Sequence, residues 1–325
     1  MPTQPAVQTQ VRIGARGSKL SLAQAGHMQR RIAEALGADP EKPEEVAAAA
    51  PLIVITTTGD KVQDRRLLEI GGKGMFTKEI EEALLDGRID CAVHSLKDMP
   101  ALLPDGLCIA AIPEREDPRD AFLSLKADSL EALPRGAVLG TASLRRQAQM
   151  LHRRPDLDVR MLRGNVDTRL AKLQAGEADA ILLAYSGLRR LGLGHLPKAL
   201  IDPNDCPPAP GQGALAIETR VGDCDAAWVQ AIRHPGTTVA VAAERGALAA
   251  LEGSCKTAIG AHAWFEGARL KLIVEALSTD GSRRFRHAGE ADLTELADAE
   301  ASARALGLSL GLAVKADAGD AIDLS

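Results

Sequence analysis

Short apolar runs alternate with amphipathic segments through the first two thirds of this 325-residue chain. The apolar runs are three to six residues long, as strands are, and the segments between them have helical spacing. This alternation predicts parallel strands in sheets that carry helices on both faces. The expected strands are 11–15, 52–57, 91–93, 107–112, 138–140, 159–162 and 180–184.

Side chains that can cap helices stand where several amphipathic segments begin. Ser18 or Ser21 precedes a helix that is expected to end near Leu36, Ser143 precedes a second helix, and a third opens near Asn165. Two more helices are expected at 77–85 and 186–191.

Clusters of glycine, proline and charge mark the expected connections. The stretch 40–50 is rich in Pro, Glu and Ala and is predicted to be a surface insertion, and Gly59-Asp60 is predicted to be a turn. The charged and glycine-rich residues 61–74 predict a mobile loop over a cleft. The Pro- and Gly-rich segment 207–213 predicts a hinge.

The pattern changes after residue 236. The short turn Asp280-Gly281 is typical of a connection between antiparallel strands. This part of the chain is therefore expected to form a small α+β domain. Its expected elements are a helix at 239–251, strands at 261–264, 270–277 and 284–287, and a helix at 292–306.

Composition argues against several classes of protein. Aromatic residues make up 2% of the chain and its pI is near 5.9, so a nucleic-acid partner is not expected. Residues 1–10 do not resemble an export signal, and no apolar run has the length of a membrane span. Five scattered cysteines indicate reduced thiols in the cytoplasm. The spacing of histidine and cysteine predicts no metal site.

Arginine is concentrated between Ser143 and Arg190, where ten Lys or Arg residues stand against five Asp or Glu in a chain of net charge -5. Several of these arginines lie at junctions of strands and helices, which carry the binding groups in α/β folds. A guanidinium group binds a carboxylate or phosphate through two parallel hydrogen bonds. The set predicts a ligand with several anionic groups, although any single arginine also fits a solvated helix face.

Two other segments carry reactive side chains. Lys97 and Asp98 follow an expected strand. At that position Asp98 could act as a general acid or base, or could stabilise a cation. It could equally be a turn residue beside a solvated lysine. Cys255 lies in a loop of small residues beside Lys256, and is either an accessible thiol with thiolate character or an incidental one.

Taken together, seven segments resemble the porphobilinogen deaminase family. They follow the family's order and cover the chain from about residue 11 to residue 260. The segments are VRIGARGS at 11–18, GKGMF at 72–76, HSLKDMP at 94–100, GTASLRRQ at 140–147, LRGNVDTRL at 162–170, PGQGA at 210–214 and LEGSC at 251–255.

The resemblance implies a transferase of heme biosynthesis with a dipyrromethane cofactor, joined by a thioether bond to a cysteine that is here Cys255. It implies that four porphobilinogen molecules are added in turn with loss of ammonia, and that water then releases the linear tetrapyrrole, hydroxymethylbilane. Each pyrrole ring brings two carboxylates, which accounts for the excess of arginine. A cytoplasmic monomer that acts on this small molecule, without a membrane partner, is expected.

The resemblance also implies roles for individual residues. Asp98 would be catalytic, because its carboxylate would stabilise the positive charge that forms as ammonia leaves and would relay the pyrrole N–H proton, with Lys97 beside it. The implied cofactor-binding residues are Cys255, Lys97, Ser143, Arg145, Arg146 and Arg163. The implied substrate-binding residues are Arg16, Ser18, Arg169, Arg190, Gln212 and Phe76.

The implied fold is α/β: two lobes like those of periplasmic binding proteins, with mixed, mainly parallel sheets, and a small α+β C-terminal domain. Lobe 1, with Asp98 and the mobile loop, is expected at 1–113 and 214–233. Lobe 2, with the arginines, is expected at 114–213, and the domain that carries Cys255 at 234–325.

Two other functions fit part of the pattern. A solute receptor could close two lobes on an anion, but it would carry an export signal. An enzyme could use Lys97 as a Schiff-base lysine for a carbonyl substrate.

Overall fold

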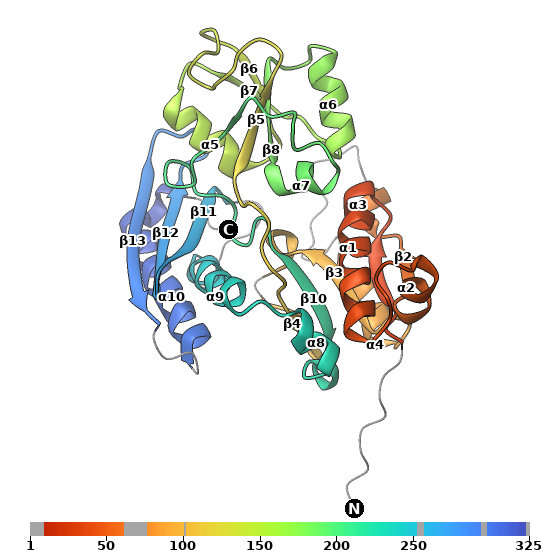
Figure 1. Cartoon of the computed structure of the whole chain (residues 1–325). Coiled ribbons are helices and arrows are strands. Elements are labelled where there is room, and N and C mark those ends of the chain that lie inside the picture. The colour runs from red at the N-terminus through yellow and green to blue at the C-terminus, as the bar shows by residue number, and fades with distance from the viewer. Residues whose placement is uncertain (1–9, 62–76, 101, 252–256, 294–297, 323–325) are drawn as a thin grey trace, which may run out of the picture. The chain divides into compact units, whose positions relative to one another are not determined.

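The structure is a computed structural model that describes residues 10–61, 77–100, 102–251, 257–293 and 298–322. The chain divides into two compact units, which contain separate hydrophobic cores. Figure 1 labels the helices and strands. None of the helices in these described ranges is long and apolar enough to cross a membrane. Unit 1 comprises Met1–Ser95, Leu102–Pro113 and Leu215–His234, and unit 2 comprises Leu96–Ala101, Glu114–Ala214 and Pro235–Ser325.

Unit 1 is built on a five-stranded sheet in the order β2-β1-β3-β10-β4. β1 pairs in parallel with β2 and β3, whereas β10 pairs antiparallel with β3 and β4. Its strands are β1 (Ile13–Arg16), β2 (Leu52–Ile55), β3 (Cys91–Ser95), β4 (Leu107–Ala111) and β10 (Leu215–Arg220).

Helix α1 (Lys19–Ala35) packs on β1 and β3 and buries Met28 and Ile32 completely. Ser18 is its N-cap, because the Ser18 side chain accepts a hydrogen bond of 3.2 Å from the backbone N–H of Ser21. The predicted cap is therefore confirmed. The other helical segments described in unit 1 are α2 (Pro43–Ala49), α3 (Thr58–Lys61), α4 (Lys78–Leu85), α8 (Ala227–Ile232) and the 3-10 turn η2 (Val221–Asp223).

Two segments of unit 1 differ in detail from expectation. The stretch 40–50 is largely exposed, as a surface segment is, but it forms α2, which packs on α1 and buries Val46 and Ala50 in the core. Pro43 at the first helical position and two glutamates in the first turn favour a helix start there. Gly59-Asp60 lies within the one-turn helix α3 rather than in a turn.

Unit 2 contains a second five-stranded sheet, in the order β7-β6-β8-β5-β9. β6 pairs in parallel with β7 and β8, and β5 pairs antiparallel with β8 and β9. The predicted mixed α/β fold is confirmed. In both sheets the antiparallel pairings involve strands that the sequence pattern did not predict, namely β5, β9 and β10. The strands of unit 2's sheet are β5 (Asp120–Ser124), β6 (Val138–Gly140), β7 (Asp158–Arg160), β8 (Ala180–Ala184) and β9 (Ala199–Leu200).

Two of the three helices that accompany this sheet begin where they were predicted to begin. The Ser143 side chain accepts from the backbone N–H of Arg146 at the start of α5 (Leu144–Arg153), at 3.4 Å. The Asn165 side chain accepts from the N–H of Thr168 at the start of α6 (Val166–Gln174), at 2.9 Å. The third helix is α7 (Tyr185–Arg190).

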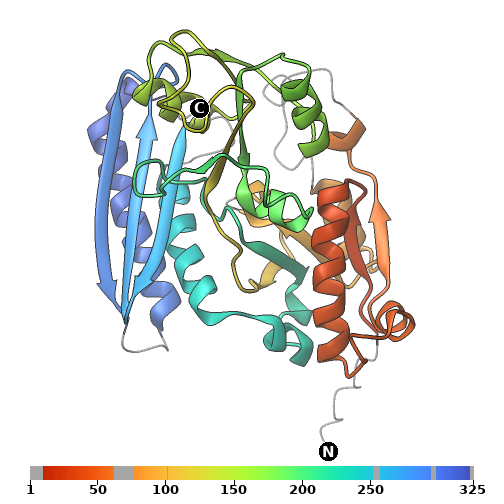
Figure 2. The ribbon, with the colours of Figure 1, turned by 45° about the horizontal axis from the view of Figure 1, so that its top comes forward.

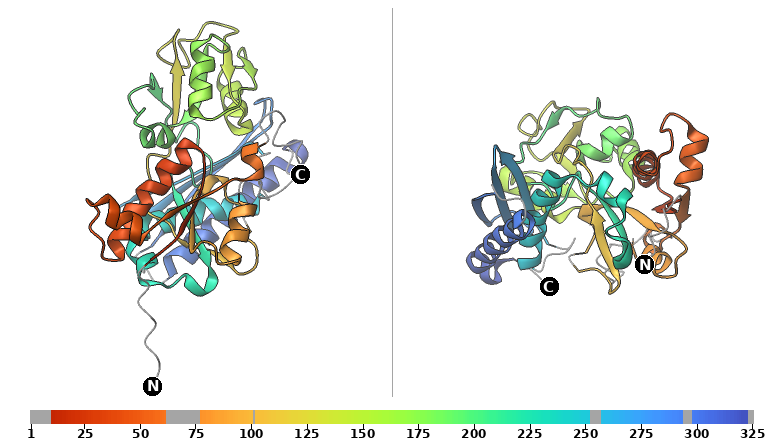
Figure 3. Two further views of the ribbon diagram at one scale, coloured as in Figure 1. Left: turned by 90° about the vertical axis from the view of Figure 1, so that its right-hand side faces the viewer. Right: turned by 60° about the horizontal axis from the view of Figure 1, so that its bottom comes forward.

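The last part of unit 2 is an antiparallel sheet of β11 (Ile259–Glu266), β12 (Arg269–Leu277) and β13 (Arg284–Asp292), as predicted. Two helices, α9 (Pro235–Ala250) and α10 (Ala299–Ala318), cover one face of it (Figures 2 and 3). They approach closely because Gly307 and Gly311 face α9, where a Cβ would clash with the backbone of Ala243 and Ala247. The predicted last helix was placed too early, since β13 extends to residue 292.

Candidate active site

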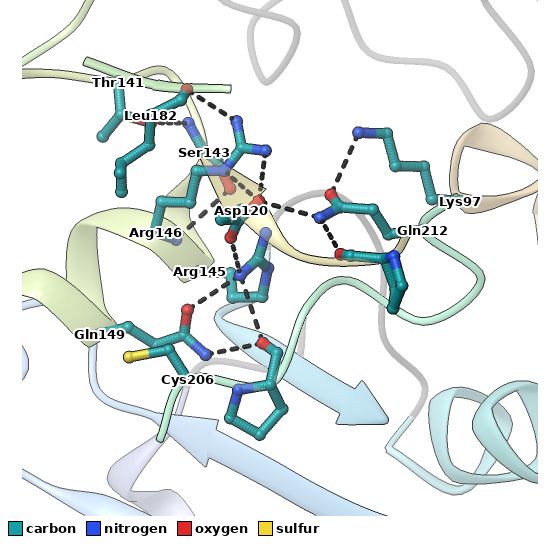
Figure 4. A network of polar contacts seen from close by, with 12 residues as sticks. Lys97, Asp120, Thr141, Ser143, Arg145, Arg146, Gln149, Leu182, Cys206 and Gln212 are labelled. Carbon is teal, nitrogen blue, oxygen red and sulfur yellow. Dashed lines mark hydrogen bonds and ion pairs between the residues drawn. The ribbon is translucent and has the colours of Figure 1, made fainter. Parts of the chain in front are cut away.

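A buried carboxylate is the centre of the polar network in unit 2. Asp120, the first residue of β5, is 4% exposed and accepts hydrogen bonds from Arg145 Nη1 (2.8 Å), Arg146 Nη2 (2.7 Å) and Gln212 Nε2 (2.9 Å) (Figure 4). Burial alone would raise the pKa of Asp120, but Arg145 and Arg146 outweigh it and hold that pKa well below its ordinary value. Asp120 is therefore a fixed negative charge among cations.

The two neighbouring arginines of α5 use their donors differently. Arg146 donates from Nε and Nη2 to Asp120 and from Nη1 to the carbonyl of Leu182 on β8. Arg145 donates from Nη1 alone, to Asp120, Gln149 and the carbonyl of Pro207, and its buried Nε has no hydrogen-bond partner. Three of the five N–H groups of Arg146 are thus committed, while Arg145 keeps a buried donor unused.

A tight loop brings Gln212 against this cluster. Gln212 is fully buried between Gly211 and Gly213, which have φ values of +75° and +89°. A Cβ on Gly213 would lie 2.3 Å from the carbonyl oxygen of Glu116, so only glycine fits there. Besides Asp120, the Gln212 amide donates to the carbonyl of Pro118, and its oxygen accepts from Lys97 Nζ at 3.3 Å. The loop therefore joins Lys97 to the carboxylate of Asp120.

Lys97 and Asp98 lie in the 3-10 turn η1 (Leu96–Asp98), Lys97 half-buried and Asp98 exposed. Burial lowers the pKa of Lys97 to about 8; Asp98 opposes this shift, and the charges of Arg146 and Arg145 add to it. The Lys97 amine thus loses its proton more readily than an ordinary lysine.

Three more arginines of unit 2 are half-buried. Burial and the charges of Arg146 and Arg163 lower the pKa of Arg169 to about 10, while Asp98 raises it. One guanidinium nitrogen of Arg163, Nη1, is buried without a hydrogen-bond partner. Arg190 donates to the carbonyl of Gly213 at 2.7 Å, and burial lowers its pKa to about 10 as well.

Positive charge exceeds negative charge in this cluster. The contacts and charge interactions above connect five cations with two carboxylates, Asp98 and Asp120. Buried cations without matching anions lower the stability of the fold. The unused donors of Arg145 and Arg163 likewise lack an acceptor. The residues present therefore fit a ligand that brings several carboxylates. The five cations are Lys97, Arg145, Arg146, Arg163 and Arg169.

The other predicted site residues do not belong to this described cluster. Arg16 ends β1 and Ser18 caps α1, both in unit 1. Cys255 and Phe76 lie outside the described residues, as does the predicted mobile loop beyond Lys61.

Two residues of the network were missed from the sequence. Asp120 heads a short apolar strand that the alternation did not predict, although a carboxylate directly before Ala121-Phe122-Leu123 was a signal that it needs a buried partner. Gln149 is 3% exposed on α5 and contacts Arg145. Nothing in its local sequence distinguishes it from a solvated helix residue.

A mixed α/β fold with a partly buried, net-cationic cluster at the ends of strands has the charge that a small ligand rich in carboxylates requires. Family models narrow the class of protein: residues 11–227 match the porphobilinogen deaminase, dipyromethane cofactor binding domain, and residues 238–316 match the porphobilinogen deaminase, C-terminal domain. The chain belongs to the porphobilinogen deaminase family. The predicted family, the dipyrromethane cofactor and the class of transferase in tetrapyrrole biosynthesis are thereby confirmed, and the receptor alternative is set aside.

Relatives match the chain from end to end. The porphobilinogen deaminase of Phenylobacterium zucineum (strain HLK1) is 75% identical over 324 residues, 100% of each chain. That of Caulobacter vibrioides (strain NA1000 / CB15N) is 70% identical over 318 residues, 98% of each chain. Among solved structures, the methionine-binding protein MetQ matches 69% of this chain and 90% of its own, with 14% identity and a TM-score of 0.43. That likeness is too weak to carry an argument.

Proposed function

We propose that this chain joins four porphobilinogen molecules in turn, with loss of ammonia at each step, on a dipyrromethane bound to Cys255 through a thioether, and that water then releases hydroxymethylbilane. The observation that carries the proposal is the excess of five cations over two carboxylates in unit 2. A ligand with two carboxylates on each pyrrole ring neutralises that excess.

The cofactor-binding residues in this proposal are those nearest to the unsatisfied donors. Arg145 and Arg163 each have a buried guanidinium nitrogen that a carboxylate would satisfy. Ser143 caps α5, the helix that carries Arg145, and Arg146 keeps two N–H groups after its three internal bonds. When bound, the dipyrromethane supplies the pyrrole carbon to which the first substrate is joined.

Lys97 and Asp98 are the proposed catalytic pair. Asp98 is exposed and close enough to Lys97 and Arg169 to affect the pKa of both, so its carboxylate stands in a positive field. In this role Asp98 stabilises the positive charge that develops on the substrate as ammonia leaves, and accepts and returns the pyrrole N–H proton. Lys97, which donates to Gln212, would contact the cofactor.

The remaining site residues are proposed to bind the substrate and the growing chain. In unit 2 these are Arg169, Arg190 and Gln212. They donate, in that order, to the carbonyl of Gly164, the carbonyl of Gly213 and the carboxylate of Asp120. Arg16 and Ser18 are proposed to contribute from the junction of β1 and α1, and Phe76 to pack on a pyrrole ring.

Intact mass tests the proposal without depending on turnover. Purified parent protein should be heavier than its sequence by two pyrrole units, and Cys255→Ala should have the sequence mass and no activity. Cys224 is a half-exposed free thiol, so Cys224→Ala is the matched control and should keep both the adduct and the activity. A parent protein of sequence mass, or an adduct that persists in Cys255→Ala, would refute the cofactor assignment.

The lowered pKa of Lys97 also favours one alternative, a Schiff base with a carbonyl substrate. Treatment with borohydride in the presence of candidate carbonyl compounds separates the two. The deaminase function predicts no reduced adduct at Lys97 in peptide maps, and a stable adduct there would support the alternative.

We also propose three functional domains, at 1–113 with 214–233, at 114–213 and at 234–325. The three separate sheets support this division.

The protein is further proposed to be a monomer in the cytoplasm. The four described cysteines are free thiols, which suits a reducing compartment. Light scattering of the purified protein and fractionation of the cells that make it check these two points.

A further inference from the structure

We propose that Gln149, held by Glu275, is a positioning residue that orients the guanidinium group of Arg145 for carboxylate binding. The inference rests on the proposed function of Arg145 and extends it to two residues that the sequence did not single out. Neither side chain belongs to the proposed set that touches cofactor or substrate, so their effect must pass through Arg145.

The orientation of Arg145 depends on three acceptors around a single nitrogen. Its Nη1 donates to Asp120 Oδ2 at 2.8 Å, to Gln149 Oε1 at 2.9 Å and to the carbonyl of Pro207 at 3.2 Å. Asp120 is shared with Arg146 and Gln212 and so does not hold Arg145 alone. Gln149 is the only side chain among these acceptors that binds Arg145 without also binding Arg146.

The orientation of the Gln149 amide follows from its partners. Arginine has no acceptor, so the atom that faces Arg145 must be the amide oxygen. The amide nitrogen donates on the other side to Glu275 Oε1 at 3.0 Å and to the carbonyl of Pro207 at 2.8 Å, both of which only accept here. Rotating the amide by half a turn would break all three bonds, so the side chain has one favoured state.

Glu275 anchors this amide from the C-terminal sheet. It is 1% exposed near the C-terminal end of β12, and Arg284 Nε donates to its second oxygen at 2.6 Å. Its partner on β11 is Gly260, where a Cβ would lie 2.6 Å from the carbonyl oxygen of Pro207 and 3.2 Å from Gln149 Nε2. The sheet thus has space at Gly260 for the groups that hold Arg145.

A chain of contacts therefore runs from β13 to the arginine: Arg284, Glu275, Gln149, Arg145. Every link is a hydrogen bond within unit 2, and the two central members are buried. Loss of Gln149 leaves Arg145 with Asp120 and one longer bond to a carbonyl, while its Nε stays unpartnered. Its guanidinium plane is then free to turn, and a bidentate grip on a carboxylate needs that plane to be fixed.

The test compares Gln149→Leu with Gln147→Leu. Gln147 lies on the same helix and also donates to the C-terminal part of unit 2, at the carbonyl of Thr279 (3.1 Å), but it does not touch Arg145. We expect Gln149→Leu to lower kcat about tenfold, with KM for porphobilinogen changed less than about threefold, because the cofactor is covalently attached and only its orientation suffers. Gln147→Leu should retain the parent kcat.

Two variants of Glu275 test the inference independently, in case Gln149→Leu does not fold. Glu275→Gln keeps an acceptor for the Gln149 amide and should stay within about twofold of the parent kcat, whereas Glu275→Leu should fall as Gln149→Leu does. Equal kcat values for Gln149→Leu and Gln147→Leu, or for the two Glu275 variants, would overturn the inference. Intact mass keeps the two proposals apart: a parent without the two-pyrrole adduct refutes the proposed function, whatever the variants do.

Discussion

The two five-stranded sheets have the same pattern of pairing but bury opposite kinds of charge. Each has two parallel pairings followed by two antiparallel ones. In unit 1 the strands β3 and β10 bury His94 against Glu218, with Nε2 and Oε2 3.0 Å apart, and Glu81 lies near them on α4. In unit 2 the strand β5 buries Asp120 under two arginines. One pattern of strands thus carries an acidic excess in one unit and a cationic excess in the other.

This difference separates a structural polar cluster from a binding one. The acidic excess of unit 1 can be relieved by a proton, and burial and the charge of Glu218 accordingly raise the pKa of Glu81. Arginine does not lose its proton at physiological pH, so the excess of the four arginines in unit 2 over the two carboxylates is relieved only by an anionic ligand. The contrast therefore predicts that charge changes in unit 2 affect chemistry and binding as well as stability, and that those in unit 1 affect stability alone.

The largest effect is expected at Asp98. Asp98→Asn keeps the size and loses the charge, so kcat should fall by about 10²–10⁴ while the protein folds normally. Asp98→Glu should retain part of the turnover, because the charge remains on a longer side chain. Asp105→Asn, another exposed carboxylate, is the control and should be neutral. A loss below tenfold in Asp98→Asn would move the proton transfer to another group.

The second effect concerns the stability of unit 2. Asp120→Asn leaves two buried guanidinium groups without their anion and should lower the free energy of unfolding by about 3–5 kcal/mol. The pKa of Asp120 is depressed, so its stabilisation is present above the ordinary aspartate pKa and is lost only as the pH falls through the lower folded value. Urea titrations at pH 5 and pH 8 should therefore show similar losses.

Asp128→Asn is the control for that experiment, since Asp128 is 91% exposed and pairs with Lys198 at 3.7 Å. It should change the free energy of unfolding by less than about 1 kcal/mol. Equal effects of the two substitutions would mean that Asp120 does not hold the arginine cluster.

A third effect separates neighbouring arginines of α7. Arg190→Leu should lower kcat/KM about tenfold to a hundredfold, the worth of a charge-assisted hydrogen bond, and enzyme with incomplete chains should accumulate in intact-mass spectra. Arg189→Leu removes only a pair with Glu116 at 3.0 Å on a half-exposed side chain and should leave the mass distribution unchanged. Identical spectra for both variants would remove Arg190 from the binding site.

The smallest effect belongs to unit 1. The folded pKa of Glu81 is raised, so its contribution to stability is present below the ordinary glutamate pKa and is lost as the pH rises through the folded value. Glu81→Gln should therefore unfold at a higher temperature than the parent at pH 8, with no advantage near pH 4. An advantage that does not depend on pH would show that Glu81 is not the titrating group.

The sequence predicted the features that local chemistry determines. Ser18, Ser143 and Asn165 were expected near helix starts and do cap helices, because a cap needs only a side-chain oxygen and the N–H groups that follow it. The strand β5 was missed because it begins with a charge whose burial depends on Arg145 and Arg146, 25 and 26 residues later. Its antiparallel direction likewise follows from a partner far along the chain.

The same distinction applies to the site. Arginines at strand–helix junctions could be singled out from their type and position, and the family resemblance supplied their roles. The contacts of Asp120, Gln149 and Glu275 could not be predicted, because only the fold brings Asp120 and Gln149 against Arg145, and Glu275 against Gln149. The roles given to Cys255 and Phe76 stay predictions, since both residues lie outside the described part of the chain.

Thermal unfolding of Arg163→Leu in two backgrounds tests most directly whether the cationic excess of unit 2 is matched by the cofactor. In the parent loaded with dipyrromethane, as verified by mass, the substitution should lower stability by about 1.5–3 kcal/mol, because a charge-assisted hydrogen bond is lost. In Cys255→Ala, without the cofactor, the same substitution should be neutral or stabilising, since it removes a cation that lowers the pKa of Arg169 by repulsion. An equal loss of stability in both backgrounds would contradict the account.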